Sequence, residues 1–169
     1  MRRLDAATPF RACLLGVALL LLTGCGCDNG PTEEITIAGE VFTLEVASTT
    51  EAIKKGLGER TSIPENGGMI FVFPDAQPRR FWMVDCLIDI DIMFLDPLGR
   101  ITAIHEMKAE PARGPEESQA EYELRLARYP STMGALYAIE LPGGRIRELG
   151  LQPGNKVVIP HDCLKQRLE

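Results

Sequence analysis

Residues 81–96 constrain the fold of this chain more than any other segment, because apolar and polar side chains alternate along it. Successive side chains of a β-strand point to opposite faces of the sheet, so the alternation predicts a strand with one buried and one polar face. The segment is longer than an ordinary strand, which predicts a bend near Leu87 and Ile88. The even positions form the predicted core side, and they are Trp82, Val84, Cys86, Ile88, Ile90, Ile92 and Phe94.

Three carboxylates recur on the polar side of this segment, at Asp85, Asp89 and Asp91. Side chains two positions apart on a strand lie ~7 Å from each other, so a Ca²⁺ or Mg²⁺ ion shared by them needs help from a neighbouring loop. Carboxylates separated by ~5–9 Å also serve glycoside hydrolysis. The simplest alternative is a hydrated acidic face. We treat the three aspartates as candidate ligand-facing residues and predict no metal site.

The remaining patterns predict a mainly β domain of the α+β class. The 12 prolines and 16 glycines indicate many turns between short elements. Short helices are expected after the Ser48-Thr49-Thr50-Glu51 capping box, within 116–129, where a strand is the alternative, and at 143–149. The expected architecture is a compact antiparallel β-sandwich or barrel-like domain with two or three short helices. Its other strands are expected at 35–38, 40–47, 69–73, 100–107, 135–141 and 156–159.

The first residues have the features of an export signal. Two arginines follow Met1, and an apolar run at 12–22 is about half as long as the ~20 residues of a membrane-spanning helix. The next residues, Leu22-Thr23-Gly24-Cys25, resemble the lipobox of bacterial lipoproteins, in which the cysteine receives diacylglycerol before cleavage. We expect a signal peptide at 1–24, a lipidated tether at 25–34 and a single domain at 35–169.

The lipobox resemblance implies that the chain is exported and held on a membrane by a lipid on Cys25. Gly26 follows the acceptor, which in a Gram-negative cell implies the outer membrane, with the domain facing the periplasm. Of the five cysteines, Cys86 and Cys163 both lie in the expected domain and are the predicted disulfide pair. The alternative is that Cys86 is a small buried apolar residue.

Composition and motifs exclude several functions. The chain carries 18 Lys and Arg against 24 Asp and Glu, a net charge of −6 that disfavours nucleic acid as a partner. No nucleophile–base motif or phosphate-binding loop is present, so no catalytic residue and no cofactor are predicted. The cluster at 161–163 is too tightly spaced for structural zinc. The sequence therefore favours a protein that is not an enzyme.

Five short blocks follow one another along the expected domain. They are Gly56-Leu57-Gly58-Glu59-Arg60, the GMIFVF run at 68–73, Phe81-Trp82-Met83, the IDIMFLD run at 90–96 and the LGLQPGNKV run at 149–157. In this order they resemble the domain-of-unknown-function family 192, over residues 35–159. The resemblance implies a compact, mainly β sandwich or barrel with small helices, often on exported proteins. It implies no activity.

The chain departs from the family pattern directly after the Trp-Met pair. The family usually has Lys-Asn-Thr there, and this chain has Val84, Asp85 and Cys86. Proline is common at the position of Asp89, and aspartate at that of Asn155. If the lysine and asparagine serve a common function, this member has altered it.

Three functional hypotheses follow. The first is a non-catalytic envelope module that binds a saccharide, a divalent cation or a protein partner through the acidic side of the 85–91 segment. The second is a small hydrolase of envelope polymers that uses two carboxylates of the same segment. The third is a structural lipoprotein that acts through a protein partner. We favour the first, because the sequence has no recognisable catalytic motif.

Overall fold

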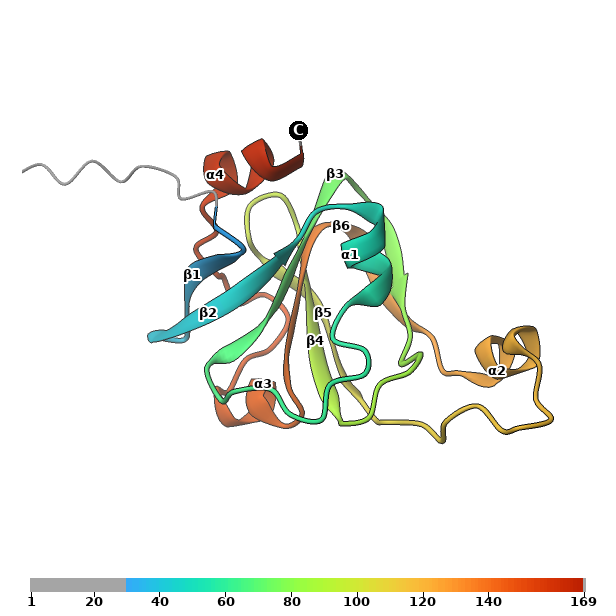
Figure 1. Cartoon of the computed structure of the whole chain (residues 1–169). Coiled ribbons are helices and arrows are strands. Elements are labelled where there is room, and N and C mark those ends of the chain that lie inside the picture. Colours follow the sequence, from blue (N-terminus) through green and yellow to red (C-terminus); the bar gives the residue numbers. More distant parts are fainter. Residues whose placement is uncertain (1–29, 169) are drawn as a thin grey trace, which may run out of the picture.

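A computed structural model describes residues 30–168 of the chain (Figure 1). One mixed sheet of six strands forms its body, in the order β1-β2-β3-β6-β4-β5. Neighbouring strands are antiparallel except for the parallel pair β2 and β3. The prediction of a mainly β domain with short helices is confirmed. The strands are β1 (Thr32–Ile37), β2 (Glu40–Ala47), β3 (Gly67–Phe81), β4 (Ile90–Leu95), β5 (Ile101–Met107) and β6 (Tyr129–Pro142).

The helices are short and lie around the sheet. Figure 1 shows α2 projecting beyond the edge of the sheet, and α4 packed near the start of β1. The α2 helix confirms the preference for a helix within 116–129, and Ser118 and Glu121 form its capping box. The helices are α1 (Thr50–Lys55), α2 (Gln119–Arg125), α3 (Arg145–Glu148), α4 (His161–Lys165) and the 3-10 turn η1 (Gln166–Leu168).

Apolar side chains cover both faces of the sheet. Alternate residues of β3 belong to two different clusters, with Ile70 in one and Phe71 in the other. The first cluster includes Ile146 of α3 and Leu164 of α4, whereas the second includes Leu57, which follows α1. All six residues of β4 are buried, which explains its nearly continuous apolar sequence.

The predicted single strand over 81–96 is wrong. β3 ends at Phe81, residues 82–89 form turns and β4 begins at Ile90. Asp85 has a φ of 54°, outside the range of extended backbone, and the Cys86 amide donates a turn hydrogen bond to the Met83 carbonyl at 3.3 Å. The alternation in 82–89 therefore does not reflect the two faces of a strand.

Three smaller predictions also need correction. β3 continues past Pro74, because the strand register shifts between Val72 and Gln77 and frees the proline from the hydrogen-bond ladder. The N-cap of α1 is Thr49, one residue after the predicted cap, and its Oγ1 accepts from the Ala52 amide at 3.2 Å. Residues 156–159 form no strand. Lys156 forms only an isolated antiparallel bridge with Arg100, the residue that precedes β5.

The predicted disulfide between Cys86 and Cys163 is wrong as well. Cys86 is a free thiol, whereas Cys163 takes part in a disulfide with another cysteine. The alternative, that Cys86 is a small buried apolar residue, is closer to the structure, in which Cys86 is half-buried.

The signal peptide and the lipid-bearing Cys25 lie outside the described residues. Within residues 30–168, no helix has both the length and the apolar character needed to cross a bilayer.

Candidate functional site

Glu140 is a buried carboxyl group near the end of β6. Only 5% of the residue is exposed, and its strand neighbours Ile139 and Leu141 are fully buried on the opposite face. The Leu57 amide donates a hydrogen bond to the carboxyl group. Its Oε2 atom has no hydrogen-bond partner in the described part of the chain. A buried acceptor without a partner is rare in proteins, so Glu140 is the first candidate for a functional residue.

Burial raises the pKa of Glu140 to about 8 by removing water from the charged form. The hydrogen bond from Leu57 and the positive charge of Arg60 lower that pKa, but they only partly compensate for the burial. Arg60 is already engaged, because its guanidinium forms a two-pronged pair with Glu45 at 2.6 and 2.7 Å. At neutral pH, Glu140 therefore carries a proton.

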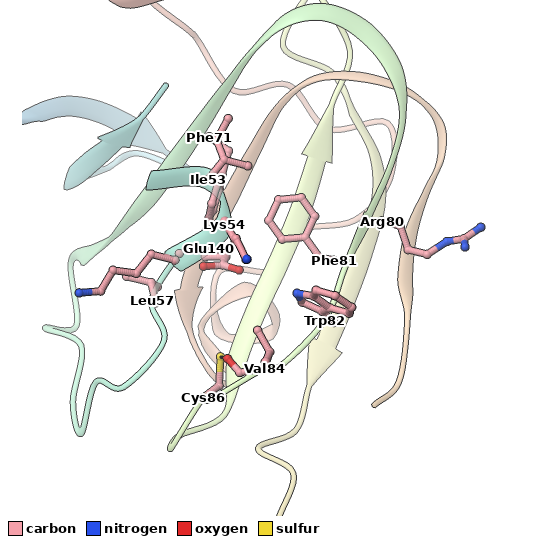
Figure 2. A pocket seen from close by; sticks show the side chains of 12 residues that line it. Ile53, Lys54, Leu57, Phe71, Arg80, Phe81, Trp82, Val84, Cys86 and Glu140 are labelled. Atoms are coloured by element: carbon pink, nitrogen blue, oxygen red, sulfur yellow. Dashed lines mark hydrogen bonds between the residues drawn. The ribbon is translucent and has the colours of Figure 1, made fainter. Parts of the chain in front are cut away.

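The Glu140 carboxyl lies in a pocket of about 210 Å³, which we call the Glu140 pocket. Figure 2 shows the carboxyl facing the loop that follows β3, while the guanidinium of Arg80 extends away from it. The loop contributes mainly apolar walls, and α1 and its following turn close the opposite side. Its apolar and aromatic lining residues are Ile53, Leu57, Phe71, Phe81, Trp82 and Val84.

Gly56 leaves room beside the carboxyl group at the end of α1. Its φ of 52° and ψ of −139° place it in a region that residues with a Cβ rarely adopt. A Cβ there would lie 3.6 Å from Glu140 Oε2 and 3.5 Å from Phe71 Cζ. A longer side chain at this position would fill space that the pocket leaves open.

Trp82 forms a wall of the pocket and is the single tryptophan of the chain. The prediction that it packs in the core is wrong, because it is half-buried in the loop after β3. The guanidinium of Arg128 stacks over the indole with its Cζ 4.1 Å from the ring centroid. Arg128 is itself fixed by the carbonyls of Glu123 and Leu126, at 2.7 and 3.1 Å. The indole is thereby held in one orientation at the mouth of the pocket.

Cys86 places a thiol in the same pocket. Burial raises its pKa to about 12, and the charges of Glu140 and Asp85 add to the increase. The thiolate is the reactive form of cysteine, so this thiol is a poor nucleophile near neutral pH.

The pocket adjoins two larger hollows, which together we call the acidic cleft. One, of about 600 Å³, shares Lys54, Lys55, Trp82 and Val84 with the Glu140 pocket and extends between α1 and α2. The other, of about 360 Å³, shares Cys86 with the pocket and Asp85 with the first hollow. Lys54 and Lys55 are the basic residues of the cleft. Its acidic residues outnumber them, and they are Glu51, Glu59, Asp85, Glu110 and Glu123.

The three predicted ligand-facing aspartates have three different environments. Asp85 is exposed in the acidic cleft, and its amide donates to the Tyr122 hydroxyl at 2.9 Å. Asp89 is at the surface, where Lys108 and the Ala109 amide hold its pKa below the usual range. Asp91 is 1% exposed and accepts from the Ile146 amide at 2.9 Å. Among residues 30–168, no group of three or more His, Cys, Asp or Glu side chains is arranged to hold a metal ion.

Sequence reasoning missed Glu140. The signal that marks it is a single carboxylate inside the apolar strand expected at 135–141, where every neighbour suits a core. A charged residue in such a strand is rarely buried unless it is paired or has a special role.

Comparisons with known proteins place the chain in a family but show no activity. The model of family DUF192, described as an uncharacterized ACR, matches residues 33–159. No curated protein matches the chain. A crystal structure of a protein of unknown function from Novosphingobium aromaticivorans DSM 12444 is 30% identical, with a TM-score of 0.60. The match covers 76% of this chain and 84% of that one.

A second crystal structure is that of a putative transcription regulator from Sinorhizobium meliloti 1021. It is 28% identical to this chain with a TM-score of 0.59, and the match covers 75% of this chain and 90% of that one. The family match spans most of the domain, from β1 to the segment before α4. The chain belongs to the DUF192 family.

Proposed function

We propose that this chain is a membrane-anchored lipoprotein whose domain binds a small ligand in the Glu140 pocket, without catalysing a reaction on it. The observation that carries this proposal is the buried Oε2 of Glu140, which has no partner in the described chain. A buried polar atom without a hydrogen bond costs about 1–3 kcal/mol. A ligand that donates to this oxygen recovers part of that free energy on binding.

The shape of the site supports binding of a small group. Its volume of about 210 Å³ is below the ~300–1,000 Å³ of sites for drug-sized ligands. Besides the exposed Lys54, Lys55 and Arg80, the walls are mostly apolar around one buried carboxyl group. Such walls are typical of sites in which a polar group fixes the orientation of the ligand. The occupant is therefore a small molecule, or one end of a larger ligand whose remainder lies in the acidic cleft.

The alternatives have less support. A hydrolase that uses two carboxylates of the 85–91 segment requires them to act on one bond, but their surroundings differ in burial and in partners. The S. meliloti relative's description concerns transcription, but a net charge of −6 and an acidic cleft repel nucleic-acid phosphates. A protein partner for a structural lipoprotein remains the alternative if no small ligand binds.

The lipid anchor rests on the lipobox that ends at Cys25. The disulfide at Cys163 supports an oxidising location outside the cytoplasm, where disulfides persist. Metabolic labelling with a palmitate analogue tests the anchor. We expect label on the wild-type chain and none on C25S. Equal label on both chains would contradict lipidation at Cys25.

Binding is tested on the full-length chain in detergent through the fluorescence of Trp82. A panel of small cations, neutral amides, alcohols and cell-wall saccharides is titrated, because the indole lines the pocket and is the only one in the chain. We expect a saturable change with at least one probe. E140Q should weaken it at least tenfold. E34Q is the control: it removes the same charge from an exposed residue of β1, and it should not weaken the change. No response to any probe would contradict the proposal.

A further inference from the structure

We propose that the ligand of the Glu140 pocket enters it with an organic ammonium group, whose N–H donates to Glu140 Oε2. This inference rests on the proposed function and assigns a chemical class to the ligand. The orphaned oxygen, the aromatic walls and the charge of the adjoining cleft each support it.

In its ionised form, Glu140 needs a donor that also carries a positive charge. A carboxylate accepts hydrogen bonds only, and the Leu57 amide supplies one of them. A neutral donor would fill the remaining position but would leave the carboxyl group protonated, because nothing would balance its buried negative charge. An ammonium group supplies both the hydrogen bond and the counter-charge. Within the described chain Arg60 cannot take this role without leaving its two hydrogen bonds to Glu45.

The walls of the pocket suit the apolar stem of such a cation. Phe71, Phe81 and Trp82 line it, and aromatic rings attract cations through their negative faces. The chain already uses this interaction at Trp82, where Arg128 stacks on the indole. The volume of about 210 Å³ fits an ammonium group on a short alkyl chain better than a bulky ring system.

The acidic cleft selects the same charge. Five carboxylates line its two hollows against two lysines. An excess of one sign around the mouth of a site raises the local concentration of the opposite ion and repels its own. The entrance therefore attracts a cationic ligand and repels a carboxylate or phosphate, because the five carboxylates of the cleft outnumber the exposed Lys54, Lys55 and Arg80 that also line the Glu140 pocket.

Binding of an ammonium ion exchanges one proton with solvent. Without a bound cation, Glu140 is a neutral acid at pH 7, because burial raises its pKa to about 8. When the ammonium group binds, the carboxyl O–H proton leaves to water and the ligand N–H takes its place, so the charge of the site is conserved. Apparent affinity should then rise about tenfold per pH unit from pH 6 to 7 and become constant above about pH 8.5.

The ammonium group has two natural sources, a free amine or the side chain of a lysine in a peptide. The probes are n-butylammonium, which reproduces the end of a lysine side chain, and Nα-acetyl-lysine methylamide, which adds the peptide groups. Affinity of the lysine derivative at least tenfold above that of n-butylammonium would indicate a peptide in the cleft. Equal or weaker affinity would indicate a free amine.

The decisive titration follows Trp82 fluorescence of the full-length chain in detergent at pH 6, 7, 8 and 9. n-Butanol and butyrate are the neutral and anionic isosteres. We expect n-butylammonium to bind at least tenfold more tightly than either, and E140Q to lose that preference while E34Q retains it. The melting temperature of each variant verifies that it is folded.

Two outcomes would overturn the inference in different ways. Binding of n-butanol as tight as that of n-butylammonium, with no dependence on pH, would contradict the ammonium assignment and leave the ligand-binding function intact. No binding of these probes, together with no response to the wider panel, would contradict the proposed function itself.

Discussion

The Asp91 carboxylate of β4 accepts a hydrogen bond from the backbone amide of Ile146 at 2.9 Å, although 54 residues separate the two in the sequence. Ile146 lies in the first turn of α3, whose N-cap Gly144 provides no side-chain hydrogen bond. Asp91 therefore caps this helix from a neighbouring strand, and its burial serves the fold. Asp91 is the one predicted ligand-facing aspartate that has a clear structural role inside the protein.

Removal of this cap should destabilise the domain. D91A leaves the Ile146 amide buried without an acceptor, and we expect a loss of about 1–3 kcal/mol in the free energy of unfolding. D91N keeps an acceptor oxygen and should lose less. Urea denaturation measures both values. Loss of ligand binding in folded D91N, without a change in stability, would contradict the structural role.

Stability should depend on pH through Glu140. The folded chain holds a proton on Glu140 that the unfolded chain releases, because the pKa rises from 4.5 to about 8 on folding. Stability therefore falls as pH rises from about 4.5 to 8, by up to about 1.4 kcal/mol per unit, and becomes constant above 8.

E140Q isolates this effect, because it keeps the shape of the side chain and removes the titration. We expect the difference in unfolding free energy between E140Q and wild type to shift in favour of E140Q as pH rises from 5 to 8. The surface carboxylate Asp89 has a lowered pKa and contributes below that window, so it does not mask the trend. A difference that is constant over this range would show that Glu140 is ionised in the folded chain.

The thiol of Cys86 should react slowly in the native protein. A pKa of about 12 leaves roughly a thousandfold less thiolate at pH 8 than an ordinary cysteine has. We expect iodoacetamide to label Cys86 at least a hundredfold more slowly in the folded chain than in urea. Mass spectrometry of the peptide that contains Cys86 measures the rate. Native labelling as fast as that in urea would contradict the burial of this thiol.

A lysine at position 84 should act as a tethered ligand. Val84 lines the Glu140 pocket at the position where the family resemblance has lysine, so V84K brings an ammonium group to the carboxyl. We expect the ion pair to lower the pKa of Glu140, to remove the decline in stability between pH 4.5 and 8, and to prevent binding of n-butylammonium. V84M is the control, because it fills similar space without charge. If V84M had the same effects on stability, the role of charge would be contradicted.

The sequence predicts most of the sheet because its strands carry strong local signals. Apolar and polar residues alternate along the strand expected at 40–47, and the strand expected at 100–107 follows a turn. The structure has strands at both places. The error at 82–89 arises from the same reasoning, because apolar residues also recur every second position in a loop that lines a pocket. Only the left-handed backbone of Asp85 distinguishes the two cases, and aspartate adopts that conformation in turns without a glycine to mark it.

The candidate site was less accessible to sequence reasoning. The Glu140 pocket joins α1, the loop after β3 and β6, which are far apart along the chain and meet only through the order of the strands. A carboxylate in an apolar run is visible in the sequence, but its lack of a partner is a property of the folded chain. The acidic side of 81–96 has the stronger pattern in the sequence, but of its three aspartates only Asp85 borders the cleft.

The most direct test of the account is the ionisation of Glu140 itself, followed by NMR of the ¹³C-labelled carboxyl carbons and assigned by comparison with E140Q. The account predicts a midpoint near pH 8 in the ligand-free chain and a clear decrease when n-butylammonium is added. A titration midpoint near pH 4.5 that the amine does not change would contradict it. Glu140 would then titrate as an ordinary carboxylate, and a cationic ligand would not be required to balance its charge.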